Sequence, residues 1–197
     1  MKKETVKKQW SETAEKSRFI AKKAAFIAVC TAFTAVCAWV TVPMPQPFVQ
    51  FTMQTFAVFF TVILLGEKDA AITVSAYVLL GLAGVPVFSG FQAAPAIAGT
   101  TGGYIIGFFF IPLSSFVFRK LFGDNFAAVI AGLAAGLAAC YAFGTAWFMI
   151  IYARKTGAIG VGSALAWCVI PYVLPDALKL TLACVIAPKI KKTLKIR

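Results

Sequence analysis

The chain has 197 residues, of which 60% are hydrophobic and 13% are charged, and its mean hydropathy is +0.86. Soluble domains are about 45–50% apolar, so this composition excludes an ordinary soluble domain and predicts that lipid covers much of the surface. The net charge of +12 comes mainly from lysines and arginines near the two ends of the chain. Because no folded basic domain accompanies them, they indicate tethering to an anionic membrane face and argue against a nucleic-acid partner.

Several chemistries lack the residue types that they need. The chain has no histidine, which excludes a His-ligated metal site and a Ser-His-Asp triad. It has no GxxxxGK[ST] phosphate loop, so we expect no ATP hydrolysis of the common kind. Asp176 is the only carboxylate within an apolar run, which leaves acid–base catalysis poorly supported. We predict a protein that is not an enzyme and that carries no metal or cofactor, with its five cysteines as small packing residues.

Taken in chain order, a polar, basic segment of residues 1–19 comes first, and we expect it to be a floppy or amphipathic leader. Apolar runs separated by charges, glycines and prolines then predict an all-α membrane protein with six transmembrane helices in one bundle. The runs span about residues 20–41, 53–66, 70–84, 102–118, 126–152 and 164–187.

The second and third runs are short and could form one re-entrant hairpin. We favour two spans because the three charges at 67–69 are poorly placed in lipid. The predicted organisation is therefore a basic segment (1–19), a six-helix domain (20–188) and a basic tail (189–197).

The distribution of positive charge predicts the topology. Six spans place both termini on one side of the membrane. With that side cytoplasmic, 16 basic residues lie inside and only Arg154 and Lys155 lie outside, while Lys179 falls within the last span. The positive-inside rule thus predicts cytoplasmic N- and C-termini.

Two predicted outer loops, residues 42–52 and 85–101, carry no charge and are rich in Pro, Gly, Gln and aromatic residues. Solvated loops are usually more polar than this. We expect these loops to fold onto the bundle and close over an apolar space, the alternative being interfacial loops without a ligand.

Asp176 and Lys179 are the sharpest candidates for a site. Their i, i+3 spacing within the last span places them on one helix face, and ionised groups in a membrane usually face the bundle interior or a cavity. Pro171 and Pro175 should loosen the start of that helix. The alternative is a salt bridge that only holds helices together.

Further candidates gather toward the same outer side. Polar groups, aromatic walls and a glycine that permits close approach are expected to surround a small organic ligand. They are Gln54, Thr55, Gln92, Tyr104, Phe51, Phe88, Phe91 and Gly103.

On the first span, Ala24, Ala28 and Ala32 recur at spacing four. They form a smooth face, either for a partner helix or for packing within the bundle. The Ala/Gly-rich residues 127–139 favour internal packing.

Four motifs occur in an order that resembles a known family. They are FTMQT (51–55), GLAGVPVF (81–88), GTTGGYIIG (99–107) and PDALK (175–179). Together they resemble the BioY family, the biotin-specific substrate-binding (S) subunits of energy-coupling-factor (ECF) importers, over about residues 20–188.

The resemblance implies a six-helix protein of the bacterial plasma membrane, with a biotin pocket near the outer face. It also implies a membrane coupling subunit and two ATP-binding-cassette ATPases as partners, with the small-residue face of the first span meeting the coupling subunit. Asp176 would accept a ureido N–H of biotin, and Lys179 would meet the ureido oxygen or the valerate carboxylate. A stand-alone secondary transporter and a structural membrane protein without a ligand are the alternatives.

Overall fold

The computed structural model describes residues 2–45 and 47–194, with side-chain surroundings from Glu15 onward. Besides helices, the described chain contains a two-residue antiparallel ladder, one 3-10 turn, an isolated bridge between Phe88 and Gln92, and connecting loops. The elements are α1 Lys2–Trp39, β1 Thr41–Val42, β2 Phe51–Thr52, α2 Gln54–Leu65, α3 Glu67–Leu82, η1 Ser89–Phe91, α4 Ala94–Ala98, α5 Gly102–Gly107, α6 Phe110–Phe122, α7 Phe126–Lys155, α8 Val161–Cys168 and α9 Ile170–Thr193.

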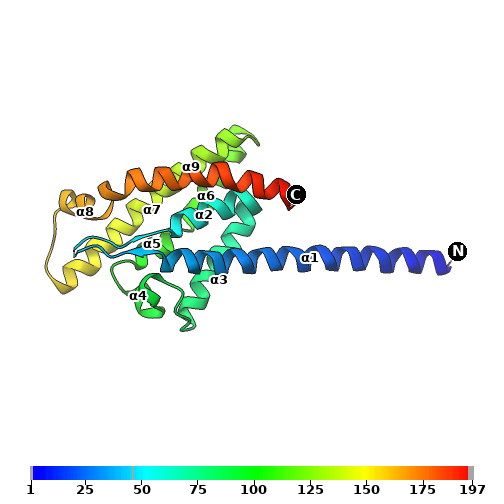
Figure 1. Cartoon of the computed structure of the whole chain (residues 1–197), viewed down its shortest axis with the longest axis horizontal. Helices are drawn as coiled ribbons and strands as arrows, with labels where there is room; N and C mark the ends of the chain where they lie inside the picture. The colour runs from blue at the N-terminus through cyan, green and yellow to red at the C-terminus, as the bar shows by residue number, and fades with distance from the viewer. Residues whose placement is uncertain (1, 46, 195–197) are drawn as a thin grey trace.

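The long helices form an elongated bundle (Figure 1). The start of α1 and the end of α9 lie at one end, and the β1–β2 ladder and α8 lie at the other. Helix α1 runs without a break through the expected leader boundary at residue 19, so the basic segment and the first apolar run share one helix.

Four helical stretches in the described residues are long and apolar enough to cross a membrane, which supports a multi-pass membrane protein. They are Glu15–Trp39, Gly102–Phe122, Phe126–Lys155 and Val161–Thr193. The second and third predicted runs are also helical, but α2 has 12 residues and α3 has 16, below the usual length of a span.

Helix α2 occupies the centre of the bundle because it is apolar on all sides. It packs against α9, α1, α3 and α6. Its Phe59 is fully buried, and it shares one core cluster with Leu133 of α7 and Ala183 of α9. This central helix carries the motif that begins the candidate site at its first turn.

Glycines set the spacing of α6 and α7. A Cβ on Gly132 would lie 2.5 Å from the Ser115 backbone, and a Cβ on Gly136 would lie 2.5 Å from that of Ile111. Only glycine permits such a close backbone approach. The prediction that residues 127–139 serve internal packing is confirmed.

The last apolar run is divided. Helix α8 ends at Cys168, and Val169 leaves helical geometry at φ −127° and ψ −58° before α9 begins. Pro171 fits the first turn of α9, where a backbone N–H has no helical partner.

The 85–101 loop folds onto the bundle as predicted. Phe88 is fully buried and Val87 is 5% exposed, in a second core cluster with Tyr77 and Ala38. Trp39 also donates its indole N–H to the carbonyl of Pro86 at 3.0 Å. The loop is therefore part of the packed structure.

Candidate functional site

Asp176 and Lys179 lie on the inner face of α9 and form an ion pair of 2.6 Å between Oδ1 and Nζ. They are 3% and 4% exposed, whereas Leu174 and Leu178 of the same helix are 72% and 59% exposed. The apolar side of α9 thus faces outward and the charges face the bundle. The predicted placement of both ionised groups on one buried face is correct.

Lys179 is fully hydrogen-bonded. Its ammonium donates to the carbonyl of Thr52 at 2.6 Å, to Thr55 Oγ1 at 3.2 Å and to Asp176. It also lies 4.0 Å from the centroid of the Phe51 ring, a cation–π contact. Since an ammonium has three donors, all of them are used.

Asp176 is less saturated. Its Oδ1 accepts from Lys179 and, at 2.8 Å, from Thr55, and its Oδ2 accepts from the hydroxyl of Tyr141. An ionised carboxylate offers about four acceptor sites, and these contacts use three of them. Asp176 can therefore take one more donor without losing a protein contact.

This pair lines a small cavity, which we call the buried cavity, with a volume of about 70 Å³. Helices α2, α5, α7, α8 and α9 contribute to its walls, together with both outer loops. The lining residues are Val49, Gln50, Thr52, Gln54, Thr55, Ser89, Thr101, Tyr104, Ile105, Phe108, Cys140, Tyr141, Cys168, Tyr172, Asp176 and Lys179.

A second, larger space adjoins it at the loop end of the bundle. This loop cavity has a volume of about 470 Å³, within the roughly 300–1,000 Å³ range of small-molecule sites. The two cavities share Val49, Gln50, Ser89 and Thr101 in their walls. The loop residues that they share therefore separate a small inner chamber from a wider outer one.

Gln54 and Tyr104 also line the buried cavity, as predicted, and both are held by hydrogen bonds. Gln54 donates to the Tyr77 hydroxyl at 2.6 Å, and Tyr77 in turn donates to the carbonyl of Val87 at 3.1 Å. The hydroxyl of Tyr104 lies 3.0 Å from Thr145 Oγ1. These contacts orient polar groups around the ion pair before any ligand binds.

The other predicted residues lie elsewhere. Gln92 lines the loop cavity. Phe88 is buried edge-on against Tyr77, with ring centroids 5.2 Å apart, and so supports the wall from behind. Phe91 is 65% exposed and stacks on Trp39, outside the linings of both cavities.

Gly103 serves helix packing in this structure. A Cβ at that position would lie 2.3 Å from Cβ of Trp147, so glycine allows α5 to approach α7. The indole N–H of Trp147 then donates to the carbonyl of Gly99 at 3.0 Å, which fixes the glycine-rich turn above the site.

Sequence reasoning missed two tyrosines. Tyr141 donates to Asp176, and Tyr172 donates to the carbonyl of Val49, which ties the 42–52 loop to α9. The sequence did contain a signal for them, because each is a tyrosine inside an apolar run. A buried tyrosine O–H needs a hydrogen-bond partner, so such a residue is expected to make a polar contact. No local spacing identified which partner.

The small-residue face of α1 is open. Ala24, Ala28 and Ala32 are all exposed, so they do not serve packing within this chain. In the described residues, no cluster of three or more Cys, Asp or Glu side chains could hold a metal ion.

Comparison with known proteins connects this geometry to a family. The BioY family matches residues 5–196. The chain belongs to the BioY family. It is 37% identical to "Biotin transporter BioY" of Thermotoga maritima, over 79% of this chain and 87% of that protein. It is 33% identical to "Probable biotin transporter BioY" of Pyrococcus horikoshii, over 73% and 81%.

The BioY-type fold is also seen in a solved structure. The crystal structure of the S-component for biotin from an ECF-type ABC transporter aligns with a TM-score of 0.76 at 24% identity, covering 91% of this chain and 98% of that one. At this level of identity the match establishes the shared fold.

Proposed function

We propose that this chain is the high-affinity biotin-binding subunit of an ECF-type vitamin importer. One observation carries the proposal: a buried, hydrogen-bonded Asp176–Lys179 pair lines a cavity beneath two uncharged loops. Ionisable groups within membrane spans are usually functional. The family membership and the biotin transporters among its relatives supply the identity of the ligand.

The pair suits the ureido group of biotin, which offers two N–H donors and a strong acceptor oxygen. The unused acceptor site of Asp176 receives one N–H, and Lys179 meets the ureido oxygen after releasing one of its present acceptors. Gln54, Tyr104 and Tyr141 provide the remaining polar contacts. Unpaired polar groups in such a site are costly, so these contacts also determine specificity.

The rest of the ligand extends toward the loop cavity. The buried cavity is too small for the whole molecule, so the wall formed by Val49 and Gln50 moves when biotin enters. The ring of Phe51 lies outside both cavity linings and supports the Lys179 ammonium from behind. The valerate carboxylate then lies in the loop cavity, where Lys155 is the charged residue of the lining.

In this proposal partner subunits drive transport, and the lack of a phosphate loop in the sequence agrees with that division of labour. A membrane coupling subunit and two ATP-binding-cassette ATPases supply the energy. The exposed Ala24, Ala28 and Ala32 face of α1 packs against the coupling subunit, where small side chains allow close helix contact.

The membrane arrangement belongs to the same proposal. Residues 20–188 form six transmembrane segments of a bacterial plasma-membrane protein, with the short α2 and α3 counted as two of them. The basic segments 1–19 and 189–197 lie in the cytoplasm, as the positive-inside rule favours. The start of α1 and the end of α9 at one end of the bundle support an even number of crossings (Figure 1).

Biotin titration of the purified protein tests the function. Calorimetry or tryptophan fluorescence in detergent should give tight binding by the wild type and severe weakening in Asp176→Asn and Lys179→Ala. A wild-type protein that binds no biotin contradicts the function. Unaltered affinity in both variants contradicts the site but leaves the function standing.

A further inference from the structure

A second pair of cavities lies at the end of the bundle that carries the termini, and it shares no lining residue with the site above. The first, the basic cavity, has a volume of about 440 Å³ and lies where the α2–α3 and α6–α7 turns meet. The second, the apolar groove, has a volume of about 380 Å³ and lies between α3 and α6. They share Glu67, Lys68 and Phe116, so they form one continuous depression.

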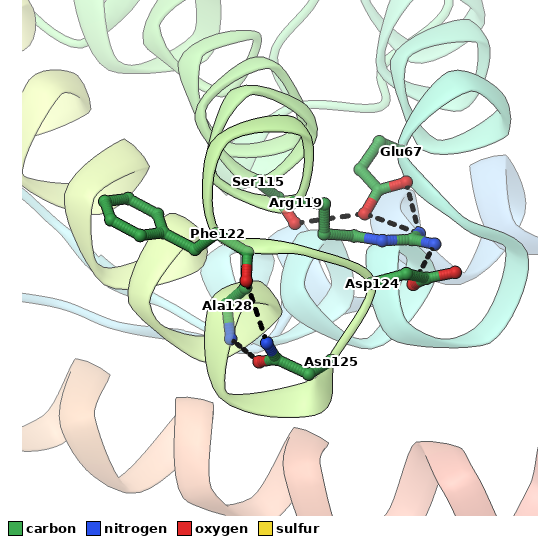
Figure 2. Close-up of polar contacts among 7 residues, drawn as sticks. All are labelled: Glu67, Ser115, Arg119, Phe122, Asp124, Asn125 and Ala128. Carbon is green, nitrogen blue, oxygen red and sulfur yellow. Dashed lines mark hydrogen bonds and ion pairs between the residues drawn. The ribbon is translucent and has the colours of Figure 1, made fainter.

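An ion-pair network of Glu67, Arg119 and Asp124 lines the basic cavity, and Figure 2 shows its hydrogen bonds. Arg119 donates to both carboxylate oxygens of Glu67, at 3.0 and 2.9 Å, and also to Asp124. Ser115 donates to the same Glu67 at 3.3 Å. Glu67 is only 8% exposed, so this arrangement is built into the fold.

The lining of the basic cavity carries four cationic and three anionic side chains, so it has one positive charge in excess. Arg119 compensates Glu67, Lys23 lies 2.8 Å from Asp69, and the side chain of Asp124 is 81% exposed to solvent. Lys68 and Lys120 line the same cavity, are exposed, and form no ion pair within the part of the chain that the structure describes. These two ammonium groups, unpaired among the described residues, account for the excess positive charge of the cavity, which attracts an anion.

The adjoining groove has the opposite character. Its walls between α3 and α6 are Ala71, Phe109, Pro112, Leu113 and Phe116. Leu113 is 56% exposed and Phe116 is 41% exposed, so the groove opens on the outer surface of the bundle. In a membrane protein such an opening faces acyl chains.

We propose that this depression binds an anionic phospholipid of the leaflet at that end of the bundle. Lys68 and Lys120 hold the phosphate headgroup, and the apolar groove holds one acyl chain. Basic pockets between spans bind anionic headgroups in this way. A free anion would use only the basic cavity, whereas an amphiphile uses both. A partner helix is less favoured, because the small-residue face that suits one lies separately on α1.

Native mass spectrometry of the full chain, exchanged into micelles with phosphatidylglycerol or phosphatidylcholine, tests the proposal. The wild type should retain phosphatidylglycerol preferentially. The double variant Lys68→Gln/Lys120→Gln should bind it about 30-fold more weakly, which corresponds to about 1 kcal/mol for each lysine near a membrane surface. Lys189→Gln/Lys192→Gln is the matched control, because it removes two charges at the same end but outside the cavity, and it should keep the preference.

One more variant and a soluble competitor distinguish a bound lipid from a free anion and from a protein partner. Ala71→Trp, which fills the groove, should also reduce lipid retention, and glycerol 3-phosphate should not displace the lipid. Equal loss in the two lysine double variants would reduce the site to diffuse attraction and overturn the proposal. Displacement by glycerol 3-phosphate would assign the cavity to a free anion. Unchanged lipid retention in Lys68→Gln/Lys120→Gln, together with lost assembly with the importer subunits, would assign the surface to a protein partner.

Discussion

Removing one or both charges of the Asp176–Lys179 pair distinguishes a ligand-binding role from a purely structural one. In Asp176→Asn, Lys179 stays buried at 4% exposure without its counter-charge. Breaking a buried pair in this way costs about 3–5 kcal/mol. Because the Thr52 carbonyl at 2.6 Å and the Phe51 ring at 4.0 Å remain, we expect the lower end of that range.

The double variant Asp176→Asn/Lys179→Met removes both charges. It keeps one amide oxygen that can accept from Thr55, and its amide NH2 can donate to the hydroxyl of Tyr141. Neutral replacements of a buried pair are often tolerated, so stability should return to within about 1 kcal/mol of the wild type. Biotin affinity should not return. Each lost charged hydrogen bond is worth about 1.5–3 kcal/mol, so binding should stay at least about 100-fold weaker.

Thermal unfolding in detergent and calorimetric biotin titration, measured on the same preparations, provide both readouts. A loss of about 3 kcal/mol should lower the midpoint by roughly 6–12 °C in a chain of this size. If the double variant were as stable as the wild type and also bound biotin with wild-type affinity, the pair would be only a structural clip.

Two other predictions concern residues around the ligand. A Cβ on Gly144 would lie 2.3 Å from the ring of Tyr104, so Gly144→Ala should displace that ring. The variant should lose about 1–3 kcal/mol of stability and bind biotin more weakly in a titration. The control Gly162→Ala, whose added Cβ would have nothing within 4 Å, should change neither stability nor affinity. Lys155→Gln should weaken the binding of biotin but not of its neutral primary amide, and the neighbouring Arg154→Gln, which is outside the cavity lining, should leave both affinities unchanged. Equal losses for biotin and its amide in Lys155→Gln would remove Lys155 from carboxylate recognition.

The sequence predicted the ion pair because its physics is local. An i, i+3 pair of charges in an apolar run has one favourable location, the interior of the bundle. Thr55 was predicted with it, and the structure places its hydroxyl between Asp176 and Lys179. Helical runs follow from hydropathy in the same way.

The site contacts that the sequence did not predict depend on how the helices pack against one another. Tyr141 meets Asp176 across 35 residues, and Tyr172 meets Val49 across 123, through a helix register that no local pattern encodes. The sequence predicted only a loosening of the helix start by Pro171 and Pro175, whereas the structure breaks at Val169 and continues α9 through Pro175. In sequence, Phe91 resembles the other aromatic residues of the loops. In the structure it has a positive φ of 56°, and its ring lies on the outside of the bundle, stacked on Trp39.

The location of biotin in a complex structure tests the central proposal most directly. A structure of the chain determined in lipid nanodiscs with bound biotin should show the fused rings in an enlarged buried cavity, with a ureido N–H on Asp176 and the valerate chain running into the loop cavity. Biotin bound at another place, with the Asp176–Lys179 pair unchanged and its cavity still closed, would contradict the account.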